Sequence, residues 1–87
     1  MPFVVREIQP TPNPNAAKFV LDRPIVQERV SFFTADAAKE HPVASQLFSV
    51  PGVTSVLLFG DFLTINKAPD AKWGNITERV RSILRTV

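Results

Sequence analysis

Hydrophobic positions along this 87-residue chain follow two periods, and these predict four strands and two helical regions. Alternation of apolar and polar residues favours strands over 3–9, 17–22, 53–59 and 62–67. Apolar residues at helical spacing occur over about 35–50, in two pieces, and over about 72–86. The order strand–strand–helix–strand–strand–helix predicts an α+β fold. We expect a two-layer sandwich, with a mainly antiparallel sheet of about four strands and two helices on one face.

The hairpin over 53–67 gives the clearest prediction. Gly60 and Asp61 form a two-residue loop, which fixes the register by pairing Phe59 with Phe62. Four apolar residues then share one face, which should meet the helices: Val56, Leu58, Leu63 and Ile65. The opposite face mixes aromatic and polar residues: Ser55, Leu57, Phe59, Phe62, Thr64 and Asn66. We expect this second face to be only partly covered, either by a partner or by another segment of the chain.

The first two strands are joined by the sequence Thr-Pro-Asn-Pro-Asn at 11–15. Its prolines fix φ and remove backbone donors, while Asn13 and Asn15 can hydrogen-bond their own backbone. We therefore predict a rigid loop. Within strand 3–9, strict alternation places Val5 on one face and Ile8 on the other.

Two weaker signals concern the middle of the chain. Val30 and Phe32 suit a short edge strand, but Pro24 and nearby charges argue against one. Thr34 is a candidate cap for a short helical turn, after which Pro42 breaks the helix and restarts it. The last helix carries its apolar stripe on six residues: Trp73, Ile76, Val80, Ile83, Leu84 and Val87.

Size and composition narrow the classes of protein. Residues 1–87 are long enough for a single small domain, and a 45% apolar fraction is enough for a core. Ten basic and eight acidic residues are spread without runs, which does not favour nucleic-acid binding. Because Arg6 and Glu7 interrupt the first apolar stretch, no signal peptide is visible, and we expect a cytoplasmic protein without membrane contact.

The residues offer little catalytic chemistry. There is no cysteine, and therefore no disulfide, thiolate nucleophile or sulfur ligand for a metal. His41, the single histidine, lies before a proline at a predicted helix start, with no serine motif or second histidine to work with it. A capping or surface role for His41 is favoured, and we predict that the chain is not an enzyme.

Two alternative functions remain open from the residues. Asp36 and Glu40 are four residues apart on a helical stretch, and with His41 they could hold an iron ion. Arg81 and Arg85 lie one turn apart on the last helix and define a weak nucleic-acid alternative. In both cases a solvated surface is the favoured interpretation.

A family resemblance adds to this picture. Its most specific part is the Thr-Pro-Asn-Pro-Asn segment followed by Lys18 and Phe19. Further elements follow in order: Leu47-Phe48, Gly52-Val53, Ser55-Val56, Asp61-Phe62-Leu63-Thr64, Lys67 and Trp73. Together they cover nearly the whole chain and resemble the N-terminal domain of Nfu/NifU-like iron–sulfur scaffold proteins. One departure is His41-Pro42-Val43-Ala44, where the family often has Ser-Pro-Leu-Ala.

The resemblance implies an accessory role in iron–sulfur cluster assembly. In full-length family members a separate C-terminal domain holds a bridging cluster on a Cys-x-x-Cys pair, which these residues lack. It thus implies contacts with assembly or recipient proteins, without cluster ligation by this chain and without a cofactor. The family domain is sometimes described as iron-binding, although these residues offer no obvious site.

We expect partner contacts at six residues of the first loop and second hairpin: Asn13, Asn15, Lys18, Asp61, Phe62 and Lys67. Each has a simpler interpretation as well. The asparagines can close the turn, Asp61 can serve the hairpin loop, and Lys67 can be solvated. Trp73 is expected in the core.

Overall fold

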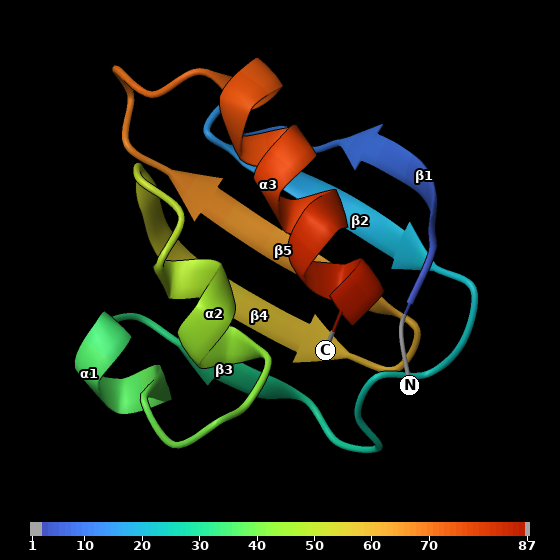
Figure 1. The fold of residues 1–87 in the computed structure, drawn as a ribbon. Coiled ribbons are helices and arrows are strands. Elements are labelled where there is room, and N and C mark those ends of the chain that lie inside the picture. The colour runs from blue at the N-terminus through green and yellow to red at the C-terminus, as the bar shows by residue number, and fades with distance from the viewer. Residues whose placement is uncertain (1–2, 87) are drawn as a thin grey trace.

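Residues 3–86 are described by a computed structural model, and within them five strands form one antiparallel sheet that carries helices on one face. The strands are β1 (Val5–Pro10), β2 (Ala16–Leu21), β3 (Val30–Phe32), β4 (Val53–Phe59) and β5 (Phe62–Lys67). The helices are α1 (Ala35–Ala38), α2 (Ala44–Phe48) and α3 (Trp73–Thr86). Figure 1 shows α2 and α3 in front of the sheet, whose order is β1-β2-β5-β4-β3. The predicted two-layer α+β fold is confirmed.

The sheet has one strand more than the expected four. Residues 30–32 form the edge strand β3, which pairs antiparallel with β4 through Val30 opposite Leu58 and Phe32 opposite Val56. Pro24 lies well before this strand, so it removes no donor from the ladder. The first helical region is split as predicted, and α1 adds a third, one-turn helix.

A bulge in β1 changes which residues face the core. Val5 pairs with Leu21 and Ile8 pairs with Phe19, and the register shifts between residues 5 and 7. One extra residue, at Arg6, therefore puts Val5 and Ile8 on the same face of the sheet. The prediction that Val5 and Ile8 oppose each other was wrong for this reason.

The core lies between the sheet and the helices. In the second hairpin Phe59 pairs with Phe62, as predicted, and the four apolar residues of that face are at most 1% exposed: Val56, Leu58, Leu63 and Ile65. From β2 come Phe19 and Leu21, and from the helices Leu47, Ile76, Val80 and Leu84. Removing this apolar area from water is the main driving force for folding, about 25 cal/mol per Å².

Local signals set the helix boundaries. The Thr34 side chain caps α1 by accepting a hydrogen bond from the Ala37 N–H at 3.1 Å. His41 Nδ1 accepts the Ala44 N–H at 3.1 Å, at the first turn of α2. The predicted stripe of α3 faces the sheet over Ile76, Val80 and Leu84, whereas Val87 lies outside the described residues.

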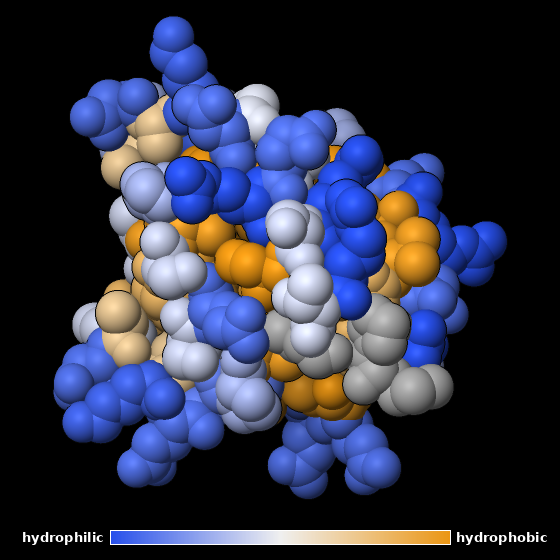
Figure 2. Space-filling model, in the orientation of Figure 1, coloured by the Kyte–Doolittle hydropathy of each residue, from blue (hydrophilic) through white to orange (hydrophobic). Residues whose placement is uncertain are grey.

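The helical face is largely polar on its outside. Figure 2 shows hydrophilic residues over much of this face, with hydrophobic residues visible between them. No helix within residues 3–86 is long and apolar enough to cross a membrane.

Candidate functional site

The loop at residues 11–15, called here the Pro/Asn loop, is closed by its own hydrogen bonds. Asn13 Oδ1 accepts the Asn15 N–H at 2.9 Å, and the Asn13 carbonyl accepts the Ala16 N–H at 3.0 Å. The Thr11 hydroxyl also donates to the Asn13 carbonyl at 2.8 Å. Asn13 therefore has the turn-shaping role that its residue type predicts.

Lys67 ties this loop to the rest of the domain. Its side chain donates from Nζ to Asn15 Oδ1 at 3.1 Å and to the Ala68 carbonyl at 3.3 Å. Nζ also lies 5.7 Å from the centre of the Trp73 ring, whose Nε1 donates to the Pro14 carbonyl at 3.1 Å. Lys67, Asn15 and Trp73 thus join β5, the Pro/Asn loop and the start of α3.

These contacts revise two expectations from the sequence. Lys67 is 9% exposed, so it is not a solvated lysine. Alternation along β5 contained this information, because Lys67 shares a face with the buried Leu63 and Ile65. Trp73 is half-buried against Phe19, with the ring centres 6.5 Å apart, and is also a link to the loop.

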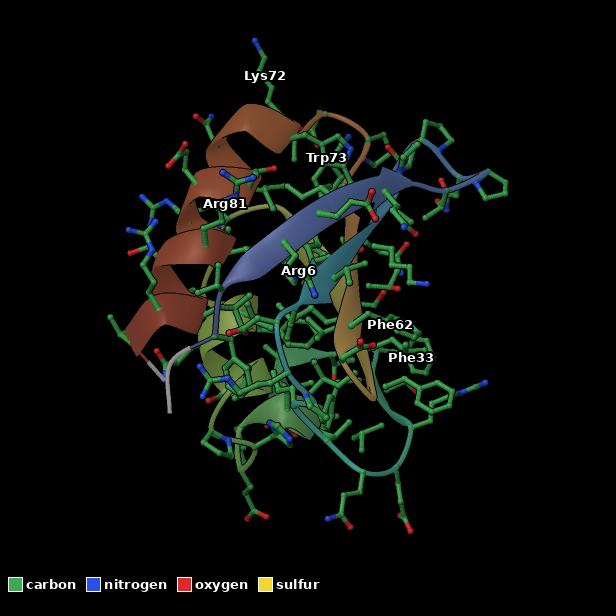
Figure 3. All side chains as sticks on the ribbon, turned by 90° about the vertical axis from the view of Figure 1, so that its right-hand side faces the viewer. Arg6, Phe33, Phe62, Lys72, Trp73 and Arg81 are labelled. Carbon is green, nitrogen blue, oxygen red and sulfur yellow. The ribbon has the colours of Figure 1, made fainter. Side chains whose placement is uncertain are left out.

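The opposite face of the sheet carries two of the six predicted contact residues. Lys18 Nζ lies 4.2 Å from the centre of the Phe62 ring, at cation–π distance. The Phe62 ring is in turn 5.7 Å from that of Phe59, which is 44% exposed. We call Lys18, Phe59 and Phe62 the aromatic face. Figure 3 shows Phe62 on the side of the sheet away from α3.

Sequence reasoning did not select Phe33, which is 74% exposed and lies on the same side of the sheet in Figure 3. Phe33 directly follows β3, whose last residue, Phe32, pairs with the buried Val56. Alternation continued by one residue would turn Phe33 to the other face. Because Pro24 and nearby charges argued against a strand at Val30 and Phe32, the sequence did not predict an exposed Phe33.

Asp61 lies at the tip of the second hairpin and directly precedes Phe62 of the aromatic face in the chain. Gly60 has a φ of +58°, a value that favours glycine, and it completes the tight turn. The Asp61 carbonyl accepts the Leu21 N–H at 2.7 Å, while its side chain is exposed.

The alternative metal ligands do not converge. Asp36 Oδ1 lies 3.7 Å from Lys39 Nζ. The centre of the His41 ring lies 5.5 Å from that of the Phe32 ring, with the rings tilted, and His41 Nδ1 accepts backbone N–H groups. Within residues 3–86 no group of three histidine, cysteine or acidic side chains is placed to hold a metal ion. The geometry gives the iron alternative no support.

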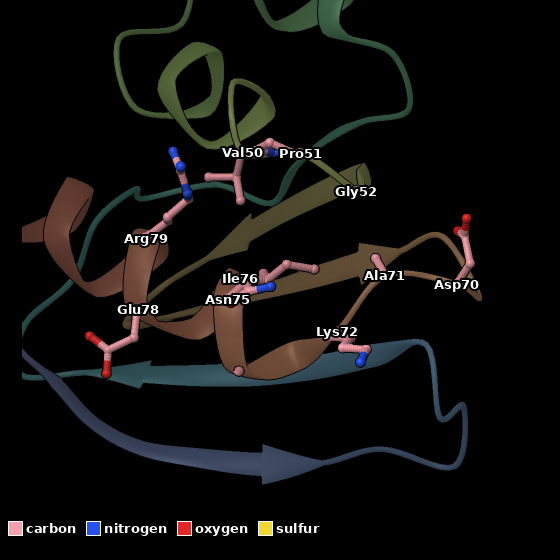
Figure 4. A pocket seen from close by; sticks show the side chains of 11 residues that line it. Val50, Pro51, Gly52, Asp70, Ala71, Lys72, Asn75, Ile76, Glu78 and Arg79 are labelled. Atoms are coloured by element: carbon pink, nitrogen blue, oxygen red, sulfur yellow. The ribbon is translucent and has the colours of Figure 1, made fainter.

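A hollow of about 840 Å³ lies between the end of α2 and the start of α3 (Figure 4). Two acidic residues, Asp70 and Glu78, and two basic ones, Lys72 and Arg79, line it together with apolar side chains. Histidine and serine are absent from its lining, so it presents no nucleophile–base pair of the serine–histidine type.

Comparisons with known proteins identify the class to which this fold belongs. The family described as "Scaffold protein Nfu/NifU N terminal" matches residues 5–87. The human protein "NFU1 iron-sulfur cluster scaffold homolog, mitochondrial" is 44% identical over 66 residues, which are 75% of this chain and 26% of that protein. Its homologue in Drosophila willistoni is 35% identical over 90% of this chain and 28% of that protein.

Two solved structures share the fold of this chain. The NifU-like protein of Saccharomyces cerevisiae matches with a TM-score of 0.79 and 26% identity, over 94% of this chain and 76% of that one. The crystal structure of Staphylococcus aureus SAV1430 matches with a TM-score of 0.77 over 92% of this chain and 96% of that one, and at 23% identity it supports the fold alone. This chain belongs to the Nfu/NifU N-terminal family, and it spans about a quarter of the length of these curated relatives.

Proposed function

We propose that this domain acts without catalysis of its own, as a protein-interaction module linked to iron–sulfur cluster assembly. Membership of the Nfu/NifU N-terminal family supports the link to assembly, because relatives in that family are named as cluster scaffold homologues. The proposed partners are iron–sulfur assembly or recipient proteins.

We further propose that these 87 residues do not ligate a cluster. Iron–sulfur clusters are held mainly by cysteine thiolates, and the chain has no cysteine. The domain would then contribute to assembly by bringing proteins together, while cluster ligands come from elsewhere.

The aromatic face is the surface that supports an interaction role best. Phe59 is a large apolar side chain that stays 44% exposed, and it packs beside Phe62 on the face of the sheet opposite the helices. Aromatic residues are enriched in protein interfaces, where they provide contact area at low entropic cost. Lys18 adds a positive charge over the Phe62 ring, and the exposed Asp61 directly precedes Phe62 in the chain.

The proposal is tested by capture from an anaerobic lysate of the native host, with bound proteins identified by mass spectrometry. A Lys18→Glu/Phe59→Ser variant changes the aromatic face, and Lys72→Glu makes the same charge change on an exposed residue just before α3. Wild type and Lys72→Glu should retain the same assembly or recipient proteins, while the aromatic-face variant loses them. Equal capture by all three folded proteins would overturn the assignment of this face.

A further inference from the structure

A second surface lies between α3 and the edge strand β1. One hollow of about 310 Å³ is lined by Ile8 and Pro10 on the β1 side and by Trp73 and Thr77 on the helix, among others. Another, of about 210 Å³, is lined by residues 3–5 and by Arg81 and Arg85. The two hollows share no lining residue but follow one another along the same side of α3, and we call them together the α3–β1 groove. Figure 3 faces this side and shows Arg81 on the helix and Arg6 on the strand.

The residues that α3 contributes to the groove change from largely apolar to cationic along the helix. Residues 73, 77, 81 and 85 are spaced by four, so they follow one line along α3. The line begins with Trp73 and Thr77 and ends with Arg81 and Arg85. The groove is therefore apolar at the end near the Pro/Asn loop and cationic at the other end.

The cationic end has no acidic counterpart within the described part of the chain. Arg81 and Arg85 are exposed, and neither has a carboxylate within 4.0 Å among residues 3–86. The neighbouring acidic residues lie elsewhere. Glu78 lines the hollow on the other flank of α3. Glu7 pairs with Val20, so it lies on the face of the sheet opposite the buried Phe19, away from the helices. Arginine pairs well with carboxylates because its guanidinium can donate two parallel hydrogen bonds.

We propose that the α3–β1 groove binds an extended acidic segment of a partner protein, with one apolar side chain in the hollow beside Trp73 and carboxylates on Arg81 and Arg85. The helix rises about 12 Å from residue 73 to 81 and about 18 Å to 85. An extended chain covers these lengths in about four residues and in about five to six residues. Because its side chains alternate between two sides, the segment is an apolar residue followed by glutamates or aspartates at the fourth and sixth positions after it.

A synthetic peptide tests this assignment directly. The probe carries one leucine, three small polar residues and then three glutamates, and Trp73, the single tryptophan, reports its arrival by a change in fluorescence. The Arg81→Gln/Arg85→Gln variant should bind about threefold to tenfold more weakly, the range expected when two exposed ion pairs are lost. Lys72→Gln/Arg79→Gln removes the same charge from the other flank of α3 and should leave binding unchanged.

Changes in the peptide separate specific binding from general attraction of anions. Replacing the leucine by glycine, the glutamates by glutamine, or the spacer by a single residue should each weaken binding. Equal weakening by the two double variants, or equal binding of a single-stranded oligothymidylate, would overturn the proposal in favour of unspecific anion binding. Phe62→Ala should not affect the peptide, so failure here is distinguishable from failure of the aromatic face as an interface.

Discussion

The buried contact between Lys67 and Asn15 should be measurable as a coupling energy. Lys67 Nζ has two oxygen acceptors within hydrogen-bond distance, Asn15 Oδ1 at 3.1 Å and the Ala68 carbonyl at 3.3 Å, and its side chain is 9% exposed. Asn15→Ala removes one of the two. A hydrogen bond to a charged group contributes about 1.5–3 kcal/mol, so we expect Asn15→Ala to lower the free energy of unfolding by that amount.

Lys67→Met is the second single variant of a double-mutant cycle with Asn15→Ala. Methionine keeps much of the volume of the lysine stem and removes the charge, so once Lys67 is replaced the amide of Asn15 has no ammonium to stabilise. The double variant should therefore lose less stability than the sum of the single variants, with a coupling of about 1–2 kcal/mol. Urea unfolding followed by circular dichroism measures these values, because a domain of this size is expected to unfold in two states.

Asn13→Ala is the matched control in the same loop. It removes the acceptor of the Asn15 N–H but no contact with Lys67. Because Asn13 reaches Lys67 only through Asn15, its coupling to Lys67→Met should be smaller than that of Asn15→Ala. If Asn15→Ala and Lys67→Met were additive, the contact would contribute nothing and the account of this loop would be wrong.

Two further predictions concern backbone and charge. Gly52→Ala should cost about 3 kcal/mol or more in urea unfolding, since φ is +96° and the new Cβ would lie 2.6 Å from that of Ala71. Gly60→Ala should cost only about 1–2 kcal/mol, because φ is +58° but nothing lies within 4 Å; equal costs would contradict this reasoning. The Val4 N–H, which donates to Asp22 Oδ1 at 3.0 Å, holds the pKa of Asp22 below its ordinary value of 3.8. The ionised form of Asp22 therefore stabilises the fold above pH 3.8. The difference in free energy of unfolding between wild type and Asp22→Asn should shrink as pH falls through the lowered pKa. A difference independent of pH would refute this.

The second hairpin shows what the sequence could determine. Its two-residue loop and its alternation predicted the pairing of Phe59 with Phe62 and the face that meets the core, and both are confirmed. These features are local, because they depend on the turn and the alternation within the hairpin itself. The break before Pro42 and the stripe of α3 depend on similarly local rules.

The errors arose where a single residue or a distant partner decides the outcome. The bulge at Arg6 shifts the register by one, which moves Ile8 to the other face and has no clear signal in the sequence. Burial of Lys67 depends on Asn15, which lies 52 residues away. Alternation alone indicated that Lys67 faces the core, but only the folded loop supplies its acceptor.

The most direct test of the account is site-specific photo-crosslinking in the native host, with p-benzoylphenylalanine in place of Phe62 and, as a control, in place of the exposed Gln46 on α2. If the aromatic face is the interface, position 62 should crosslink to an iron–sulfur assembly or recipient protein, and position 46 should not. Crosslinks of the same protein from position 46 but not from 62 would contradict the central claim.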